Sequence, residues 1–69
     1  MTFGQKVKSR RKELGMTQVE LAFKTNLSQG YISMLERDGF NPTALVIMRL
    51  AMGLDLSIDR LLPDDRKAG

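Results

Sequence analysis

The sequence predicts an all-α fold, a compact five-helix domain, and three observations lead to this expectation. Apolar residues recur at helical spacing, a residue of the kind that caps helices precedes each apolar segment, and no stretch shows the alternation of a strand. The chain has 69 residues, which is enough for one domain with a small core. We expect that domain over residues 1–63, followed by a disordered tail at 64–69 that has no apolar content.

The first predicted helix covers residues 3–14. Thr2 followed three residues later by Gln5 fits a capping box, in which each residue satisfies a backbone amide of the other. Gly15 is a natural C-terminal stop. Three apolar side chains lie near one face of this helix and are expected to pack on it: Phe3, Val7 and Leu14.

Two short helices joined by a tight turn are predicted next. Thr17 and Glu20 form a second capping box, and the helix ends near Thr25. Asn26 follows where a left-handed backbone is needed, which asparagine tolerates better than most residues. Ser28 caps the third helix. The second helix is expected to supply apolar surface through Val19, Leu21, Ala22 and Phe23, and the third is expected to point Ile32 and Leu35 inward.

The fourth and fifth helices are predicted to begin after Thr43 and Ser57. In the fourth, the expected inward stripe is Ala44, Ile47, Met48 and Ala51, while Leu45, Val46 and Met52 lie largely off it. Extra apolar residues on a surface helix indicate a partner surface. We expect homodimer contacts through Leu45, Arg49, Met52 and Leu56; the alternative is a somewhat apolar monomer surface.

Composition excludes most common chemistry. The chain has no cysteine and no histidine, so it lacks disulfides and the usual general base, nucleophile and zinc ligands. We therefore expect no enzyme, no cofactor, no metal site and no small-molecule substrate. No signal peptide is recognisable, and no apolar run approaches the roughly 20 residues of a membrane span. The sequence predicts a soluble cytoplasmic protein without a membrane partner.

The charge is unevenly distributed along the chain. Residues 1–37 contain seven basic and three acidic residues, whereas residues 38–69 contain four basic and five acidic ones. The net charges are therefore +4 and −1. This asymmetry favours a polyanionic partner on one side of the molecule, although a solvated basic helix would look the same.

Residues 3–62 resemble the helix-turn-helix of the phage-repressor and Cro family, the Xre type. The resemblance rests on five segments and on a later Asn-Pro and Leu-Leu: Thr17-Gln18, Glu20-Leu21-Ala22, Asn26-Leu27-Ser28, Tyr31-Ile32-Ser33, Leu35-Glu36-Arg37, Asn41-Pro42 and Leu61-Leu62. Two positions depart from the family pattern, Asn26 where glycine is usual and Gly30 where a polar residue is common. The resemblance implies a lambda-repressor-like fold that places a recognition helix, residues 28–36, in the major groove of double-stranded DNA.

Four residues of this recognition helix are candidates for contact with bases. The amide of Gln29 can bond adenine bidentately or contact guanine, and Ser33 lies one turn further on the same face. Gly30 cannot read a base edge, but it permits close backbone approach. Met34 is suited either to a thymine methyl group or to semi-exposed packing. For Gln29 the alternative is a solvated surface residue.

Seven residues are candidates for contact with phosphates: Lys8, Arg10, Gln18, Ser28, Tyr31, Arg37 and Asn41. The resemblance implies that Gln18 donates to a phosphate and braces the first base-reading residue, and that Tyr31 packs on the frame and directs its hydroxyl to a phosphate. For each basic residue, a solvated surface position remains an alternative. The resemblance also implies a partly buried structural ion pair between Arg11 and Glu36.

These features predict a sequence-specific DNA-binding transcriptional regulator, of repressor or controller type, that binds a pseudo-palindromic operator as a homodimer. The homodimer is expected because two recognition helices must lie one DNA turn apart, roughly 34 Å. The alternative is an antitoxin or another protein-interaction module with the same fold. The sequence leaves the operator sequence open, and it does not separate repression from activation.

Overall fold

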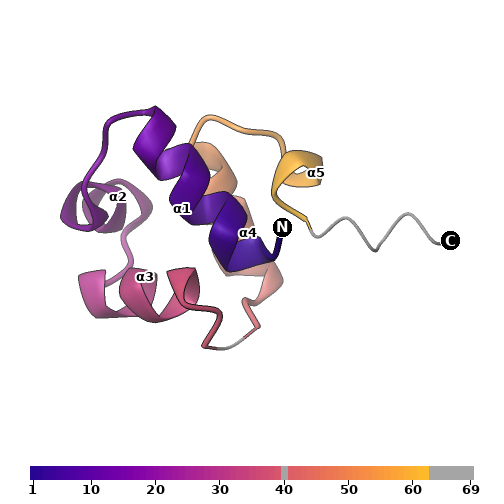
Figure 1. Cartoon of the computed structure of the whole chain (residues 1–69), viewed down its shortest axis with the longest axis horizontal. Helices are drawn as coiled ribbons and strands as arrows, with labels where there is room; N and C mark the ends of the chain where they lie inside the picture. Colours follow the sequence, from indigo (N-terminus) through magenta and orange to yellow (C-terminus); the bar gives the residue numbers. More distant parts are fainter. Residues whose placement is uncertain (40, 63–69) are drawn as a thin grey trace, which may run out of the picture.

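The computed structural model describes residues 1–39 and 41–62, and that part of the chain consists of α-helices joined by short loops (Figure 1). The all-α, five-helix prediction is confirmed. The predicted tail at 64–69 and the boundary at 63 lie outside the described residues. The helices are α1 (Phe3–Glu13), α2 (Gln18–Thr25), α3 (Gln29–Glu36), α4 (Ala44–Gly53) and α5 (Ile58–Leu61).

Side-chain caps begin the first four helices where the sequence predicts them. Thr2 and Thr17 each form a complete capping box, with Gln5 and Glu20 as the reciprocal partners. The hydroxyl of Ser28 accepts from the backbone amide of Tyr31 at 3.0 Å, and Thr43 caps α4 in the same way. Ser57 precedes α5 but makes no side-chain cap bond. These caps set the starts of α2 and α3, and so fix the phase of both helices.

Left-handed residues redirect the chain after the helices. Asn26 follows α2 with φ 60°, which confirms the predicted conformation at that position. Asp38 has φ 60° after α3, and Asp55 has φ 55° after α4. Asparagine and aspartate are the residues that adopt this conformation most readily after glycine. The turn at Asn26 joins α2 to α3 and lets the two helices pack against each other.

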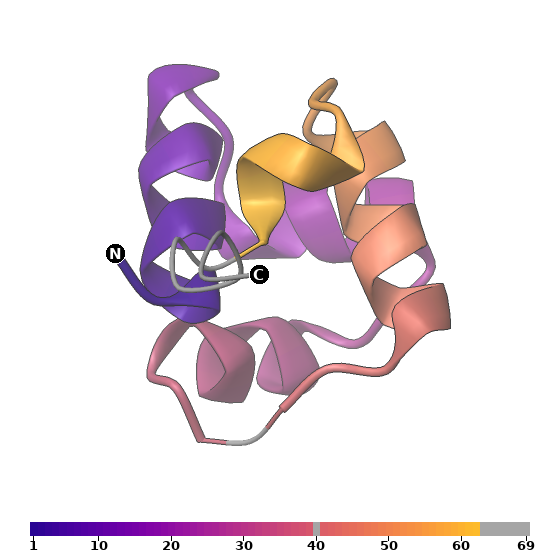
Figure 2. The ribbon, with the colours of Figure 1, turned by 90° about the vertical axis from the view of Figure 1, so that its right-hand side faces the viewer.

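The helices pack around one small core. In Figure 1, α1 crosses in front of α4, and α3 lies along the lower edge of the molecule. Figure 2 shows α1 and α4 on either side, with α3 below both. α1 contacts α3 and α5, while α2 contacts α3 and α4. On the side of α3 away from these contacts, Gln29, Gly30 and Met34 are exposed. The buried apolar side chains are Phe3, Val7, Leu21, Ala22, Ile32, Leu35, Leu50, Ala51, Leu54 and Leu61.

Three residues expected to supply packing surface are exposed instead. Leu14 is 40% exposed, Val19 62% and Phe23 89%. Leu14 lies at the C-cap of α1, after the last helical residue. On α2 the core side is occupied by Leu21, Ala22 and Thr25, which leaves the positions of Val19 and Phe23 on the solvent side.

The predicted inward stripe of α4 is wrong in part. Ala44 and Met48 are exposed, whereas Val46 packs against the core together with Ile47. The helix is oriented by Leu50 and Leu54, which are both 0% exposed. Residues 47, 50, 51 and 54 follow the spacing of one helical face, so the residue at 48 is turned outward.

α1 and α3 approach each other at Gly4. A Cβ atom at this position would lie 2.2 Å from the backbone oxygen of Leu35 and 2.5 Å from Oδ1 of Asp38. The hydroxyl of Thr2 donates to the same Asp38 oxygen at 2.7 Å. The missing side chain of Gly4 therefore lets the start of α1 lie directly on the end of α3. No sequence pattern predicted a role for this glycine.

We expect Gly4→Ala to lower the free energy of unfolding by about 1–3 kcal/mol, because the backbone of α3 must move to admit the methyl group. Gly30→Ala is the matched control, since a Cβ at Gly30 meets nothing within 4 Å. It should raise stability by up to about 1 kcal/mol through helix propensity alone. Urea unfolding of both variants tests this; equal midpoints would contradict the close approach.

Candidate nucleic-acid interface

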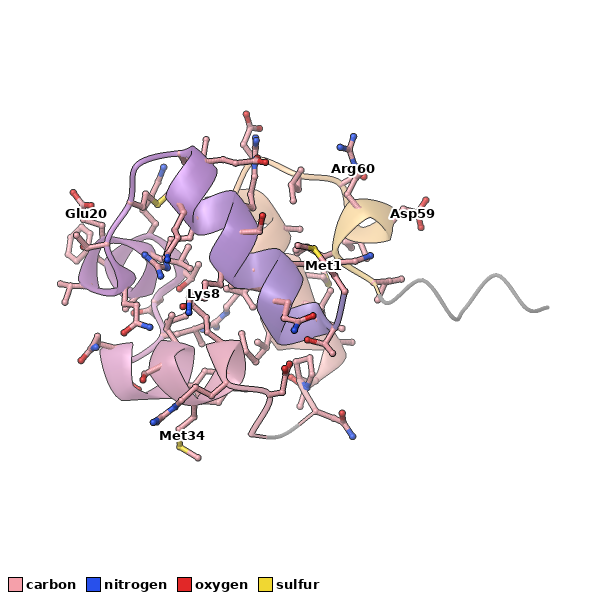
Figure 3. The ribbon with its side chains drawn as sticks, viewed as in Figure 1. Met1, Lys8, Glu20, Met34, Asp59 and Arg60 are labelled. Carbon is pink, nitrogen blue, oxygen red and sulfur yellow. The ribbon has the colours of Figure 1, made fainter. Side chains whose placement is uncertain are left out.

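The outer face of α3 presents the four predicted base-reading residues. Gln29, Gly30 and Met34 are exposed and Ser33 is half-buried. In Figure 3, Met34 projects from the lower edge of α3, away from the rest of the molecule. On the opposite face, Ile32 and Leu35 are 0% and 1% exposed and hold the helix on the core. One side of α3 is therefore held on the core, and the other side presents mainly small or polar residues to solvent.

A buried ion pair joins α1 to the end of α3, as the family resemblance implies. Nε of Arg11 lies 2.7 Å from Oε2 of Glu36, and Nη2 of Arg11 lies 3.1 Å from Oε1. The side chains are 9% and 2% exposed. Nη1 of Arg11 also donates to the backbone oxygen of Met16 at 2.8 Å. The guanidinium therefore fixes the loop before α2 as well as α3.

Hydrogen bonds extend from this ion pair to the surface through two glutamines. Nε2 of Gln18 donates to Oε1 of Glu36 at 3.1 Å, and Nε2 of Gln29 donates to Oε1 of Gln18 at 2.9 Å. Gln18 is thus bonded to Gln29, in agreement with the implication of the resemblance that Gln18 braces the first base-reading residue. Its bond to Glu36 was not expected from the sequence. An unbroken row of side chains thus runs from Arg11 in α1 to Gln29 on the exposed face.

Exposed polar residues surround this face on several elements. Lys8 is exposed on α1 and reaches toward α3 in Figure 3. Ser28, Arg37 and Asn41 are exposed at the two ends of α3 and in the loop beyond it. Tyr31 is half-buried and packs against the core. The phosphate candidates other than Arg10 therefore surround α3, as a groove-bound helix would require.

Arg10 lies elsewhere and has other partners. Its Nε donates to the backbone oxygen of Leu54 at 2.9 Å, and Nη2 donates to that of Asp55 at 3.3 Å. Nη1 lies 3.2 Å from Oε1 of Glu13. The loop that contains Leu54 and Asp55 crosses the top of Figure 1, on the side opposite α3. Arg10 thus ties α1 to this loop, away from α3.

Two exposed apolar surfaces lie outside the polar face of α3. Leu45, Met48 and Met52 are 57%, 50% and 81% exposed on one side of α4. Of the other predicted dimer residues, Arg49 is half-buried and Leu56 packs partly on the core. The second surface is formed on α2 by Val19 and Phe23, beside the exposed Glu20 at the left of Figure 3.

Neither a metal cluster nor a membrane-spanning helix is found in the described part of the chain. Residues 1–39 and 41–62 contain no group of three or more acidic residues close enough to hold an ion. Within the same ranges, no helix has the length and apolar character needed to cross a bilayer.

Known proteins match both the sequence and the fold. The family model described as "Helix-turn-helix" matches residues 7–61. The immunity repressor protein of Bacillus phage phi105 is 38% identical over 65 residues, which are 94% of this chain and 45% of that repressor. The restriction–modification controller protein C.AhdI from Aeromonas hydrophila superimposes with a TM-score of 0.84 and 33% identity, covering 87% of this chain and 91% of the controller.

A structure of the P22 c2 repressor in complex with a synthetic operator gives a TM-score of 0.84 and 31% identity, covering 90% of this chain and 94% of that one. The fold is therefore that of a phage-repressor DNA-binding domain in its helix order and turn. The chain belongs to the helix-turn-helix family, in its phage-repressor and Cro-like branch, and the predicted resemblance is confirmed. It spans less than half the length of the phi105 repressor, 45%.

We expect Glu36→Ala to lower the free energy of unfolding by about 3–5 kcal/mol, because it leaves the Arg11 guanidinium buried without its counter-charge. Thermal unfolding measures the loss. Arg37→Ala, at the adjacent exposed position, is the control and should change stability by less than about 0.5 kcal/mol. An unchanged melting temperature for Glu36→Ala would show that the ion pair has no structural role.

Proposed function

We propose that this chain is a sequence-specific DNA-binding transcriptional regulator that inserts α3 into the major groove. The observation that supports this most strongly is the row of hydrogen bonds that ends at Gln29. A side chain held in place by a buried ion pair at the start of an exposed helix is suited to reading a base edge. The solved P22 c2 relative was determined with a synthetic operator bound, which agrees with this function.

The proposed phosphate contacts are made by residues that surround α3. Lys8, Arg37 and Asn41 are exposed, so their side chains can reach the DNA backbone beside α3. Ser28 and Gln18 lie at the N-termini of α3 and α2, where backbone amides favour an anion. Such contacts supply affinity and orientation, while discrimination between bases comes from Gln29 and its neighbours.

A homodimer is the proposed functional form. One eight-residue reading helix contacts only a few base pairs, and a second copy related by a twofold axis would double the site. The exposed side chains of Leu45, Met48 and Met52 on α4 form the apolar strip that would meet its own copy. We include Met48 in the proposed interface because its side chain is exposed beside Leu45 and Met52, and we give Leu56 a smaller role because it packs partly on the core.

The experiment that tests the function is selection of bound sequences from a randomised DNA pool, followed by anisotropy titration at two salt concentrations. Enrichment of two related half-sites, with affinity that falls steeply as salt rises, is the expected result. Weak binding without any enriched sequence would contradict the proposal.

Removal of one proposed phosphate contact should change the salt dependence in a defined way. Arg37→Ala should lower the slope of log affinity against log salt by about one unit, because one fewer counterion is released per contact. Arg60→Ala is the control, since Arg60 is an exposed arginine on α5, far from α3 in Figure 3. Equal slopes for both variants would exclude Arg37 from the interface.

Charge introduced on α4 should separate the protomers. Met52→Lys places an ammonium group in the proposed interface and should shift sedimentation from dimer to monomer, with weaker operator binding. Phe23→Lys is the matched control, because Phe23 is an equally exposed apolar residue on α2, at 89% against 81% for Met52. If only Phe23→Lys dissociated the dimer, the interface would lie on α2.

A second candidate function is a protein-interaction module, such as an antitoxin that neutralises a toxin. The observation that favours it is the presence of two separate exposed apolar surfaces, on α2 and on α4, where a dimer needs only one. The salt titration distinguishes the two functions. A regulator binds DNA on its own, whereas a pure interaction module does not.

A further inference from the structure

We infer that Glu36, which lies too deep to touch DNA, determines that Gln29 accepts adenine and rejects guanine at the base it contacts. The inference rests on the proposed function and specifies the chemistry of the same site. It follows from the order of donors and acceptors along the row Glu36, Gln18 and Gln29. The sequence alone left open whether Gln29 bonds adenine bidentately or contacts guanine.

An ionised carboxylate can only accept hydrogen bonds. Oε1 of Glu36 lies 3.1 Å from the amide of Gln18, so the amide atom facing it must be the nitrogen. The carboxylate cannot turn away, because Arg11 donates to both of its oxygens and the side chain is 2% exposed. The buried charge therefore decides which end of the Gln18 amide points inward.

The orientation of Gln18 in turn fixes the orientation of Gln29 at the surface. Once the nitrogen of Gln18 faces Glu36, its oxygen faces Gln29. The atom of Gln29 that lies 2.9 Å from this oxygen must then be a donor, the amide nitrogen. A glutamine amide is nearly symmetrical in size, so without this partner either end of Gln29 could point either way. Glu36 thus fixes two amides in succession.

The hydrogen bond to Gln18 limits which groups of Gln29 are left to bind DNA. One N–H of Gln29 is used by Gln18, which leaves one N–H and the oxygen Oε1 for a base. Adenine offers an acceptor and a donor in the major groove, N7 and the N6 amino group, and matches this pair. Guanine offers two acceptors, N7 and O6, so one of them would face Oε1 and be repelled. The fixed amide therefore selects adenine.

Discrimination of this kind should amount to about 5- to 150-fold, the range for one good bidentate contact. The test starts from the operator obtained by selection and compares adenine with guanine at the position of Gln29. Gln18→Met removes the link but leaves Arg11 and Glu36 paired, and it should lose most of the adenine preference. Arg37→Gln is the control; it should weaken both operators equally and keep their ratio.

Glu36→Gln gives a second and sharper outcome. An amide at this position can donate to Gln18, which then turns over and presents its nitrogen to Gln29. Gln29 would be left with two free N–H groups, and the preference should move toward guanine. Because this variant also weakens the bond to Arg11, its melting temperature is measured in parallel and binding is compared at a temperature where it remains folded.

A measurement without DNA separates this inference from the proposed function. In the free protein labelled with ¹⁵N, side-chain amide protons of Gln29 should show nuclear Overhauser contacts to Gln18, and Gln18→Met should return them to the shifts of a free glutamine. Absence of these contacts overturns the inference even if DNA binding is selective. Adenine preference that survives in Gln18→Met overturns it as well. Failure of the wild type to select DNA instead rejects the proposed function.

Discussion

The ion pair between Arg11 and Glu36 is the constraint on which the remainder of the structure depends. It joins α1, which precedes the helix-turn-helix, to the end of α3, and its guanidinium also holds the loop that leads into α2. Desolvating two charges is costly, and a pair this deep adds little net stability compared with apolar side chains of similar size. The contribution of the ion pair is geometric, because bidentate bonding permits a single relative position of α1 and α3.

Polar groups inside such a small domain are tolerated because each has a partner. In the described residues, no buried side-chain nitrogen or oxygen lacks a hydrogen bond. Thr25, which is 3% exposed between α2 and α4, donates its hydroxyl back to the oxygen of Leu21 at 2.7 Å. The core can therefore stay small and still hold α3 rigidly, which a reading helix requires.

Local signals in the sequence predicted the helices and their caps well, because a cap is an interaction within four residues. These signals predicted less well which side chains of α2 and α4 are exposed to solvent. Both helices have apolar residues on more than one side, so only packing against Leu50 and its neighbours decides that Met48 and Phe23 face outward. The partners of Arg10 and the bond from Gln18 to Glu36 join residues 44 and 18 positions apart. The periodic pattern of the sequence does not predict contacts between residues so far apart in the chain. The Arg11–Glu36 pair was predicted only because the family resemblance implied it.

The open space around Gly30 has a consequence for how this domain can diverge. A side chain there would meet nothing within 4 Å, although the residue lies beside Gln29 on the exposed face. The frame that orients α3 does not depend on this position, so a single codon change can add a side chain to the proposed DNA-facing surface without disturbing the fold. Under the proposed function, a change of operator is thus separable from stability, and a duplicated copy would need very few mutational steps to acquire its own set of genes.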